Sequence, residues 1–341
     1  MLSVHLPTAG SGFDGTPCQS LTTLARHRPS SSFTSPMPAT NFYSGYPLHR
    51  AHSRRAETGW LQAIQSGRDV RVLALWRNRH HVQDEVTPQP LWQQGALARE
   101  IVKSADDTVF LGERDAVPHY ACDISAADDP LADILAGTGG VFADLRSLAP
   151  LVTRDDGAIM AAARGLLYWH RRARWCGKCG SPTSSIDAGH ARVCDRPTCG
   201  ERWFPRVDPA VIMLVTHKDR CLLGRQATWP PGMHSTLAGF VEIGESMEET
   251  VIREVAEEAG LRVVGRPEYR HSQPWPFPSS LMLGFRAETA DDQLQIDEDE
   301  LEQASWFTRE ELRASPENET FRLPGKVSIA RRLVEEWISE A

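Results

Sequence analysis

The chain has 341 residues, 41% of them hydrophobic, and a formal net charge of −8 at pH 7. That is enough apolar material for two or three domains with cores of their own, and the negative charge excludes a general nucleic-acid coat protein, although it allows a local basic site. No apolar run approaches the length of a membrane-spanning helix, so we expect a soluble, cytoplasmic protein without membrane partners.

Residues 1–55 are rich in Ser, Thr, Pro and Gly and show no hydrophobic periodicity. Such a composition predicts a disordered tail without catalytic importance. A transit peptide has a similar composition, but no amphipathic helix is evident. Translation from Met37 is another explanation of this segment.

Residues 56–170 form a first predicted domain. Runs of β-branched and aromatic residues predict strands at 70–76, 108–111, 119–124 and 141–145. Apolar residues near helical spacing predict a helix at 156–170. This pattern indicates an α+β domain, and it contains no catalytic motif.

Residues 171–206 contain four cysteines in two closely spaced pairs, Cys176 and Cys179, then Cys194 and Cys199. Two such pairs joined by a hairpin-length spacer can place four sulfurs around Zn²⁺. Two disulfides or unrelated buried cysteines are the alternatives, but nothing marks the chain as secreted. Because four thiolates leave no open position for water, we expect the zinc to be structural.

The same segment is rich in cations: Arg171, Arg172, Arg174, Lys178, Arg192, Arg196, Arg202 and Arg206. A basic ribbon of this kind is typical of nucleic-acid binding. A solvated surface that offsets the acidic remainder explains the same residues, and we favour it.

Residues 207–341 form the predicted catalytic domain. The apolar run 210–215 predicts a strand buried on both faces. Further strands are expected at 220–223, 235–241, 262–270, 281–287 and 306–307, with helices at 309–314 and 327–339. Mixed strands with few helices indicate an α/β sandwich around a mixed sheet.

A helix between Ser246, its expected cap, and Gly260, its expected stop, carries the strongest chemical signal. Glu254, Glu257 and Glu258 fall at i, i+3 and i+4 and share one helix face. Clustered carboxylates suit Mg²⁺ or Mn²⁺. A solvated acidic face is the alternative for three glutamates taken alone.

The full spacing decides between these alternatives. Gly239, Glu245, Arg253-Glu254-Val255, Glu257-Glu258 and Gly260-Leu261 match the Nudix box. The chain therefore resembles Nudix hydrolases, which cleave nucleoside diphosphates linked to another group by using a divalent metal.

Two further stretches are similar to the NADH pyrophosphatases of that family: SQPWPFPSS at 272–280, and SIARRL at 328–333. Three prolines make the first a stiff loop that is unsuited to a central strand. A cysteine ribbon before the Nudix domain and an additional N-terminal domain are also similar. The chain departs from the usual pattern in the four residues that separate Cys194 from Cys199, where two are usual.

The resemblance implies a role for individual residues. The implied Mg²⁺ or Mn²⁺ ligands are Ala238 (through its carbonyl), Glu254, Glu257, Glu258 and Glu300, and the general base is Glu257 or Glu258. Asp297 and Asp299 compete with Glu300 for its place. The implied substrate-binding residues are Arg146, Phe204, Phe240, Gln273, Pro274, Trp275, Pro276, Phe277, Pro278, Ser279, Ser280 and Ala330, with Phe204 donated across the interface of a homodimer.

The implied activity is hydrolysis of NADH or NAD⁺ to nicotinamide mononucleotide and AMP, and the same chemistry applies to the NAD cap of RNA. A non-catalytic nucleotide sensor with a nucleic-acid-binding ribbon is the alternative, which the complete glutamate set disfavours.

Overall fold

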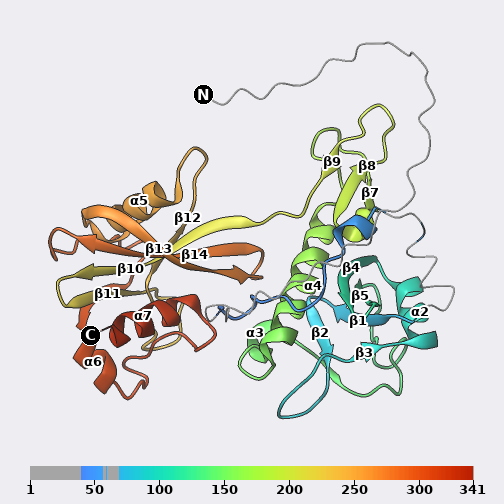
Figure 1. Ribbon diagram of the computed structural model, residues 1–341, viewed down its shortest axis with the longest axis horizontal. Helices are drawn as coiled ribbons and strands as arrows, with labels where there is room; N and C mark the ends of the chain where they lie inside the picture. The colour runs from blue at the N-terminus through green and yellow to red at the C-terminus, as the bar shows by residue number, and fades with distance from the viewer. Residues whose placement is uncertain (1–39, 57–58, 60–68, 341) are drawn as a thin grey trace, which may run out of the picture. The chain divides into compact units, whose positions relative to one another are not determined.

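The computed structural model describes residues 40–56, 59 and 69–340 (Figure 1). Most of the predicted tail, residues 1–39, lies outside the described residues. The end of that tail differs from the prediction of disorder, because Phe42, Tyr43 and Leu48 are buried in a hydrophobic core. Periodicity missed this segment because it is irregular backbone with one short 3-10 helix, η1 (His52–Arg54).

The first domain is built on a mixed sheet in the strand order β4-β5-β1-β2-β6, with β3 also paired to β1. Leu73 and Leu75 of β1 join one apolar cluster together with residues of α4, and Val72 and Ala74 join a second cluster with residues of α2. The sheet is therefore covered by a helix on each face. Its strands are β1 (Arg71–Trp76), β2 (Arg79–Val82), β3 (Trp92–Gln93), β4 (Asp107–Arg114), β5 (Val117–Asp123) and β6 (Val141–Ala143), and its helices are α2 (Gly95–Ser104), α3 (Leu145–Leu148) and α4 (Arg154–Arg172).

A three-stranded sheet, β7-β8-β9, follows α4 and carries the cysteines. A buried polar cluster joins it to the first domain. Arg192 donates from Nη1 to Asp107 Oδ1 at 2.9 Å and to His170 Nδ1 at 2.7 Å. The elements of this ribbon are β7 (Thr183–Ile186), the 3-10 helix η2 (Asp187–Gly189), β8 (Ala191–Cys194) and β9 (Arg202–Trp203).

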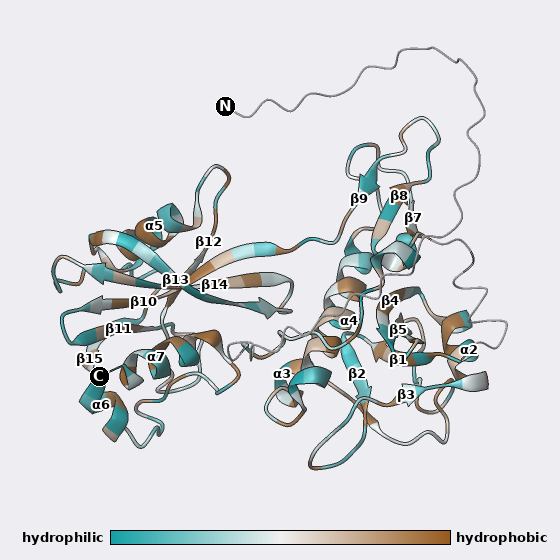
Figure 2. Cartoon of the chain, viewed as in Figure 1, coloured by the Kyte–Doolittle hydropathy of each residue, from teal (hydrophilic) through white to brown (hydrophobic). Residues whose placement is uncertain are grey.

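The C-terminal domain contains a second mixed sheet, in the order β13-β14-β10-β11-β15, with β12 also paired to β10. Successive residues of β10 point to opposite faces, so that Val211 and Met213 pack with α5, whereas Ile212 and Leu214 pack with α7. Helices α5 and α7 lie on opposite faces of this sheet (Figure 1), and both mix hydrophobic with hydrophilic residues, as helices with one buried side do (Figure 2). The predicted sandwich is confirmed. Its elements are β10 (Asp208–His217), β11 (Arg220–Arg225), β12 (Leu237–Phe240), α5 (Met247–Ala259), β13 (Val263–Trp275), β14 (Ser280–Thr289), β15 (Gln303–Thr308), α6 (Arg309–Ala314) and α7 (Ile329–Ser339).

The two large sheets share one connection pattern. In each, the first strand pairs antiparallel with the second and third strands and parallel with the fifth, as β1 does with β2, β3 and β5 and β10 does with β11, β12 and β14. Helix α2 therefore occupies the place in the first sheet that α5 occupies in the second. On α2 the buried residues are Ala98, Ile101 and Val102, so no carboxylate is buried on it.

Some predicted elements differ in the structure. Residues 272–275, expected in a loop, form the end of β13, and only 276–279 form the turn to β14. Pro274 is tolerated there because β13 is an edge strand, where a missing N–H leaves no partner unpaired. Among the described residues, no helix is both long enough and apolar enough to span a membrane.

Candidate active site

Helix α5 begins and ends as its sequence predicts. The Ser246 side chain accepts a hydrogen bond from the Glu249 N–H, and the Glu249 carboxylate accepts one from the Ser246 N–H, which completes a capping box. Gly260 ends the helix in the left-handed region at φ 68°, where glycine carries no steric penalty. These ends fix which residues of the helix face the sheet.

Three carboxylates meet at one end of the sheet. One ligand oxygen from each of Glu254, Glu258 and Glu300 lies within 4.8 Å of the others. Glu254 and Glu258 are buried, and Glu300 is exposed. Glu257 lies outside this group, since its side chain is 59% exposed and bound to Arg253. Three of the four predicted acidic ligands are thus brought together, and the competing Asp297 and Asp299 are not among them.

Gly239 is required by the position of Glu254. A Cβ atom at Gly239 would lie 1.8 Å from Glu254 Oε1, which is far closer than atoms can approach. Strand β12 carries this glycine and is held to β10 by the pairing of Val211 with Gly239 and of Ile212 with Ala238. The glycine therefore lets a buried carboxylate lie directly against the backbone of the sheet.

Arg253 holds the glutamates from outside. Its guanidinium donates to both carboxylate oxygens of Glu245 at 2.7 and 2.9 Å, to Glu254 Oε1 at 2.8 Å and to Glu257 Oε2 at 2.9 Å. It also donates to the Phe240 carbonyl at 3.0 Å. Hydrogen bonds from Arg253 hold the pKa of Glu245 at about 2. Arg253 is thus placed to fix the glycine loop and the carboxylates.

The electrostatics of Glu258 fit a divalent cation. Burial raises the pKa of Glu258 to about 8, and the negative charges of Glu254 and Glu300 add to this, while a backbone hydrogen bond at Ala238 opposes it. Glu258 Oε1 is buried and has no hydrogen-bond partner. A buried carboxyl oxygen without a partner, beside two further carboxylates, is a donor set that suits a hard divalent cation.

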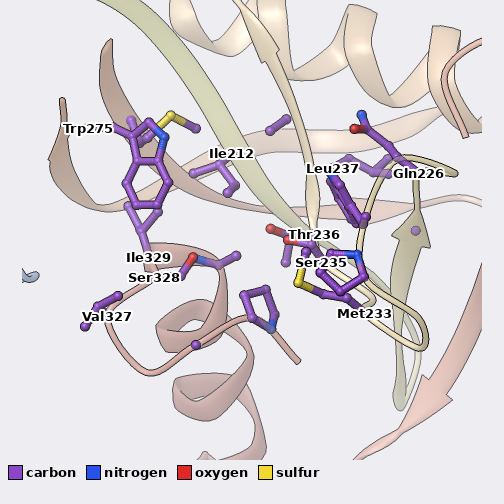
Figure 3. A pocket seen from close by; sticks show the side chains of 18 of the residues that line it. Ile212, Gln226, Met233, Ser235, Thr236, Leu237, Trp275, Val327, Ser328 and Ile329 are labelled. Atoms are coloured by element: carbon purple, nitrogen blue, oxygen red, sulfur yellow. The ribbon is translucent and has the colours of Figure 1, made fainter. Parts of the chain in front are cut away.

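A cavity of about 630 Å³ opens beside this cluster (Figure 3). Glu258 and Ala238 line it next to the metal-ligand set, and Trp275, Arg146 and Ala330 also line it. The remaining lining is mostly apolar, and the figure shows Ile212, Leu237, Met233 and Ile329 around the space. The site therefore combines an acidic corner with an apolar, aromatic wall, as a nucleotide pocket requires.

Only one of the two aromatic residues in the predicted stretch lines the cavity. Trp275 lines the cavity, whereas Phe277 packs behind it, with ring centroids 5.2 Å apart. The Arg146 guanidinium lies 4.1 Å from the Phe277 ring centroid and 5.7 Å from that of Trp275. Arg164 donates to the Pro276 carbonyl at 3.0 Å and thereby ties the turn to α4.

Several predicted substrate-binding residues do not line the cavity. Gln273 is fully buried, with its amide bonded to backbone groups. Phe204 and Phe240 are 64% and 59% exposed. The others outside the lining are Pro274, Pro276, Phe277, Pro278, Ser279 and Ser280.

Sequence reasoning missed one side of the cavity, which the segment between β11 and β12 forms. Gln226, Trp229, Met233, Ser235 and Thr236 line it there (Figure 3). Thr236 Oγ1 is buried without a hydrogen-bond partner. The only signal in the sequence is Trp-Pro-Pro-Gly at 229–232, which predicts a loop but does not predict that the loop borders a pocket.

The four ribbon cysteines are arranged for zinc. Their sulfur atoms all lie within 4.8 Å of one another. Cys176 Sγ is 3.8 Å from Cys199 Sγ, and Cys179 Sγ is 3.4 Å from Cys194 Sγ. Tetrahedral zinc with Zn–S bonds of about 2.3 Å holds its sulfurs about 3.8 Å apart. The wider second knuckle therefore still brings Cys199 to the other three, and the set fits a structural zinc.

The basic residues of the ribbon are mostly paired with carboxylates. Arg192 is buried against Asp107, and Lys178 Nζ lies 3.0 Å from Glu201 Oε2. Acidic partners also lie within ion-pair distance of Arg171, Arg174, Arg202 and Arg206. This pairing favours a solvated, internally neutralised surface over a nucleic-acid-binding face.

We expect Cys176→Ser to lose stoichiometric zinc and to destabilise residues 171–206, because metal-binding energy is folding energy in so small a unit. Metal analysis of the purified variant and of the unmodified protein under reducing conditions measures this. Cys221→Ser is the matched control, since Cys221 is a buried thiol of β11 outside the ribbon. Unmodified protein without zinc would reject the four-cysteine site.

Comparisons with known proteins agree with this architecture. A Nudix domain model matches residues 206–325, an NADH pyrophosphatase-like rudimentary Nudix domain model matches residues 70–169, and an NADH pyrophosphatase zinc ribbon model matches residues 171–204. The carboxylate helix and its glycine loop thus lie in a Nudix domain. The match of the first domain agrees with the connection pattern that the two sheets share.

Related proteins match more than half of the chain. The protein named NAD-capped RNA hydrolase NudC from Mycobacterium bovis (strain BCG / Pasteur 1173P2) is 42% identical over 253 residues, which are 71% of this chain and 79% of that protein. The human protein named NAD-capped RNA hydrolase NUDT12 is 42% identical over 194 residues, 54% of this chain and 42% of that protein. A crystal structure of a Nudix hydrolase from Nitrosomonas europaea is 23% identical with a TM-score of 0.40, covering 49% of this chain and 91% of that one. The chain belongs to the NADH pyrophosphatase group of the Nudix hydrolase family.

Proposed function

We propose that this protein hydrolyses the diphosphate linkage of NADH and NAD⁺, and that it removes the NAD cap from RNA by the same reaction. The observation that carries the proposal is the carboxylate cluster of buried Glu254, buried Glu258 and exposed Glu300, in which Glu258 also lines a cavity that has an aromatic wall. The names of the relatives support the same chemistry. A sensor without catalysis has no use for a complete cluster of metal-binding carboxylates.

The carboxylate cluster would hold a divalent cation, which we propose to be Mg²⁺ or Mn²⁺, with Glu254, Glu258 and Glu300 as its side-chain ligands and the Ala238 carbonyl nearby. Such a cation supplies neutralisation of the diphosphate oxygens and activation of water. Without it, three carboxylates would repel both the diphosphate and an attacking hydroxide.

The proton acceptor in this proposal is Glu258. Glu258 is the carboxylate of the cluster that also lines the cavity, where a water that attacks the diphosphate would have to give up its proton. Glu257 is exposed and bound to Arg253, so this proposal does not use it as a ligand. Arg253 keeps Glu254 and the glycine loop in place during turnover.

The rest of the cavity would bind the organic part of the substrate. Trp275 offers a flat ring at one wall, and Arg146 offers a cation next to it that suits a phosphate or a ribose hydroxyl. Stacking on aromatic rings tolerates different bases. The same pocket therefore accepts a free dinucleotide and the 5′ end of an RNA that begins with NAD.

We also propose that the protein acts as a homodimer. Phe204, which is 64% exposed, lies in the linker to the catalytic domain, and Phe240, which is 59% exposed, follows the glycine of the box. Large exposed rings of this kind are typical of surfaces that a partner covers. Light scattering of the purified protein measures the assembly, and a monomer at the concentration used for activity would reject this part.

The test of the proposed function is product analysis after incubation with NADH and Mg²⁺ or Mn²⁺. We expect AMP and the nicotinamide mononucleotide as the only products, and no turnover with EDTA. NAD-capped RNA is expected to yield nicotinamide mononucleotide and RNA with a 5′-monophosphate. Free nicotinamide together with ADP-ribose would indicate a glycohydrolase and reject the assignment.

We propose that the exposed ring of Phe240, beside the glycine loop and outside the cavity lining, stacks on the nicotinamide. Phe240→Ala is then expected to raise the KM for NADH about tenfold and the KM for ADP-ribose much less, because ADP-ribose has no nicotinamide ring to stack. Steady-state kinetics with both substrates measures this. Tyr269→Ala is the control, since Tyr269 is also an exposed aromatic residue of this domain. Equal changes for the two substrates would exclude Phe240 from nicotinamide recognition and leave the reaction unaffected.

A further inference from the structure

The segment Asn41–Tyr43 precedes both large sheets in sequence but contacts the aromatic end of strand β13. The Tyr43 ring packs edge-on against Trp275 and Phe277, with centroids 6.3 and 6.0 Å apart. On its other side, the Phe42 ring lies over Gly157 of α4, so closely that a Cβ atom there would be 2.7 Å from it. The segment is therefore wedged between α4 and the back of the cavity wall.

The backbone of this segment is held in an unusual conformation. Tyr43 has φ 67°, in the left-handed region, although it is an aromatic residue and is only 3% exposed. Residues other than glycine enter this region at a steric cost, and surrounding contacts must maintain them there. Here the conformation turns the ring inward onto Trp275 and Phe277.

Hydrogen bonds tie the segment to strand β13 and helix α7, which carry the cavity-lining residues Trp275 and Ile329. Asn41 Nδ2 donates to the Ser272 carbonyl of β13 at 2.7 Å, and Asn41 Oδ1 accepts from Arg332 of α7 at 3.1 Å. Gln273 Nε2 donates to the carbonyls of Phe42 at 3.0 Å and of Val327 at 2.7 Å.

The side-chain oxygen of Gln273 links the segment to a second residue of the cavity wall. Gln273 Oε1 accepts from the Ile329 N–H at 2.9 Å. Val327 and Ile329 both line the cavity, as Trp275 does, whereas none of Asn41, Phe42 and Tyr43 lines it. The segment thus contacts, from behind, the residues that form one side of the pocket.

We propose that Asn41–Tyr43 is a positioning segment of the active site, which sets substrate affinity by fixing Trp275 and residues 327–329 without touching the substrate. This inference rests on the proposed function, because it takes NADH as the substrate. Among the described residues, no hydrogen bond or ring contact of the segment reaches Glu254, Glu258 or Glu300, so we expect its effect to fall on binding and not on the chemical step.

The experiment uses the full chain with Tyr43→Gly, and with Tyr43→Phe as the matched control. Glycine adopts φ 67° without strain, so this change removes the ring without penalising the backbone. We expect Tyr43→Gly to raise the KM for NADH about tenfold, in line with the loss of two aromatic contacts, while kcat stays within about threefold. Tyr43→Phe keeps the ring, so its KM for NADH is expected to equal that of the unmodified protein.

Other outcomes overturn the proposal. A lower melting temperature of Tyr43→Gly with an unchanged KM would make Tyr43 a purely structural residue. A fall in kcat at constant KM would place its effect on chemistry and would also reject the inference. If Tyr43→Gly fails to fold, Asn41→Ala removes the tether alone, and an unchanged KM for that variant overturns the proposal.

Failure of the proposed function is separately visible. Titration of NADH in EDTA, followed by its nicotinamide fluorescence, compares binding without turnover. If Tyr43→Gly binds NADH more weakly than the unmodified protein does, the positioning role is supported. If the unmodified protein does not cleave NADH, the proposed reaction is rejected, whatever the binding result. Equal binding to both proteins would reject the positioning role.

Discussion

Glu258→Gln is expected to lower kcat for NADH by about 10²-fold or more, because it removes the charge of a buried carboxylate that lines the cavity and has one oxygen without a partner. The change preserves size, so folding is expected to be normal by circular dichroism. Steady-state kinetics at saturating Mg²⁺ measures the effect. Glu248→Gln is the matched control, since it removes one charge from the same helix at a residue that pairs with Arg266 outside the cluster. Activity of Glu258→Gln within a few-fold of the unmodified protein would remove Glu258 from the mechanism.

The same variant has a pH-dependent effect on stability when metal is absent. A pKa raised from 4.5 to about 8 means that the folded state binds more protons than the unfolded state between these values, so stability falls as pH rises through this range. The glutamine variant lacks that loss. In EDTA we expect it to melt at a higher temperature than the unmodified protein at pH 8.5, and the difference to vanish near pH 4.5. A difference that does not depend on pH would contradict this.

Gly239→Ala is expected to abolish metal-dependent turnover, with a loss of about 10²-fold or more, typical of a displaced metal ligand. The added Cβ would lie 1.8 Å from Glu254 Oε1 and 1.9 Å from its carboxyl carbon. Either Glu254 leaves the cluster or β12 moves away from α5, and both outcomes destroy the ligand geometry. Titration of Mn²⁺ binding, together with NADH turnover, measures the loss.

Gly165→Ala provides the control for this glycine, because a Cβ atom at Gly165 has nothing within 4 Å. It lies within α4, where alanine is favoured over glycine, so activity is expected to be unchanged and stability unchanged or higher. If Gly239→Ala keeps the Mn²⁺ affinity of the unmodified protein, the close approach of Glu254 to the backbone is not required for the metal site.

Signals that act over a few residues predicted the structure well. The cap at Ser246, the stop at Gly260 and the helix 309–314 follow from hydrogen bonding within one turn, and the structure confirms all three. The alternation of β10 between two cores follows from its continuous apolar run. The fold class was therefore accessible from the sequence.

Arrangements that depend on distant residues were harder to predict. The 3.6-residue period placed Glu257 with Glu254 and Glu258, but Arg253 holds Glu257 at the rim, and spacing does not reveal that competition. The segment 40–55 has no periodicity and belongs to the tail that is predicted to be disordered. It is packed because Trp275 and Gly157, far away in the sequence, supply its contacts. The loop that carries Met233 likewise borders the cavity through tertiary packing alone.

Two large sheets in one chain have the same strand order, and repeats of like topology are prone to misassembly and strand exchange during folding. The two sheets differ in the length of their central parallel strand pair. Strand β10 makes nine register pairs with β14, whereas β1 makes five with β5. A β1 strand inserted in the place of β10 would leave backbone groups of β14 buried and unpaired, at a cost of about 1–3 kcal/mol for each. The difference in strand length therefore disfavours this exchange, independently of the catalytic residues.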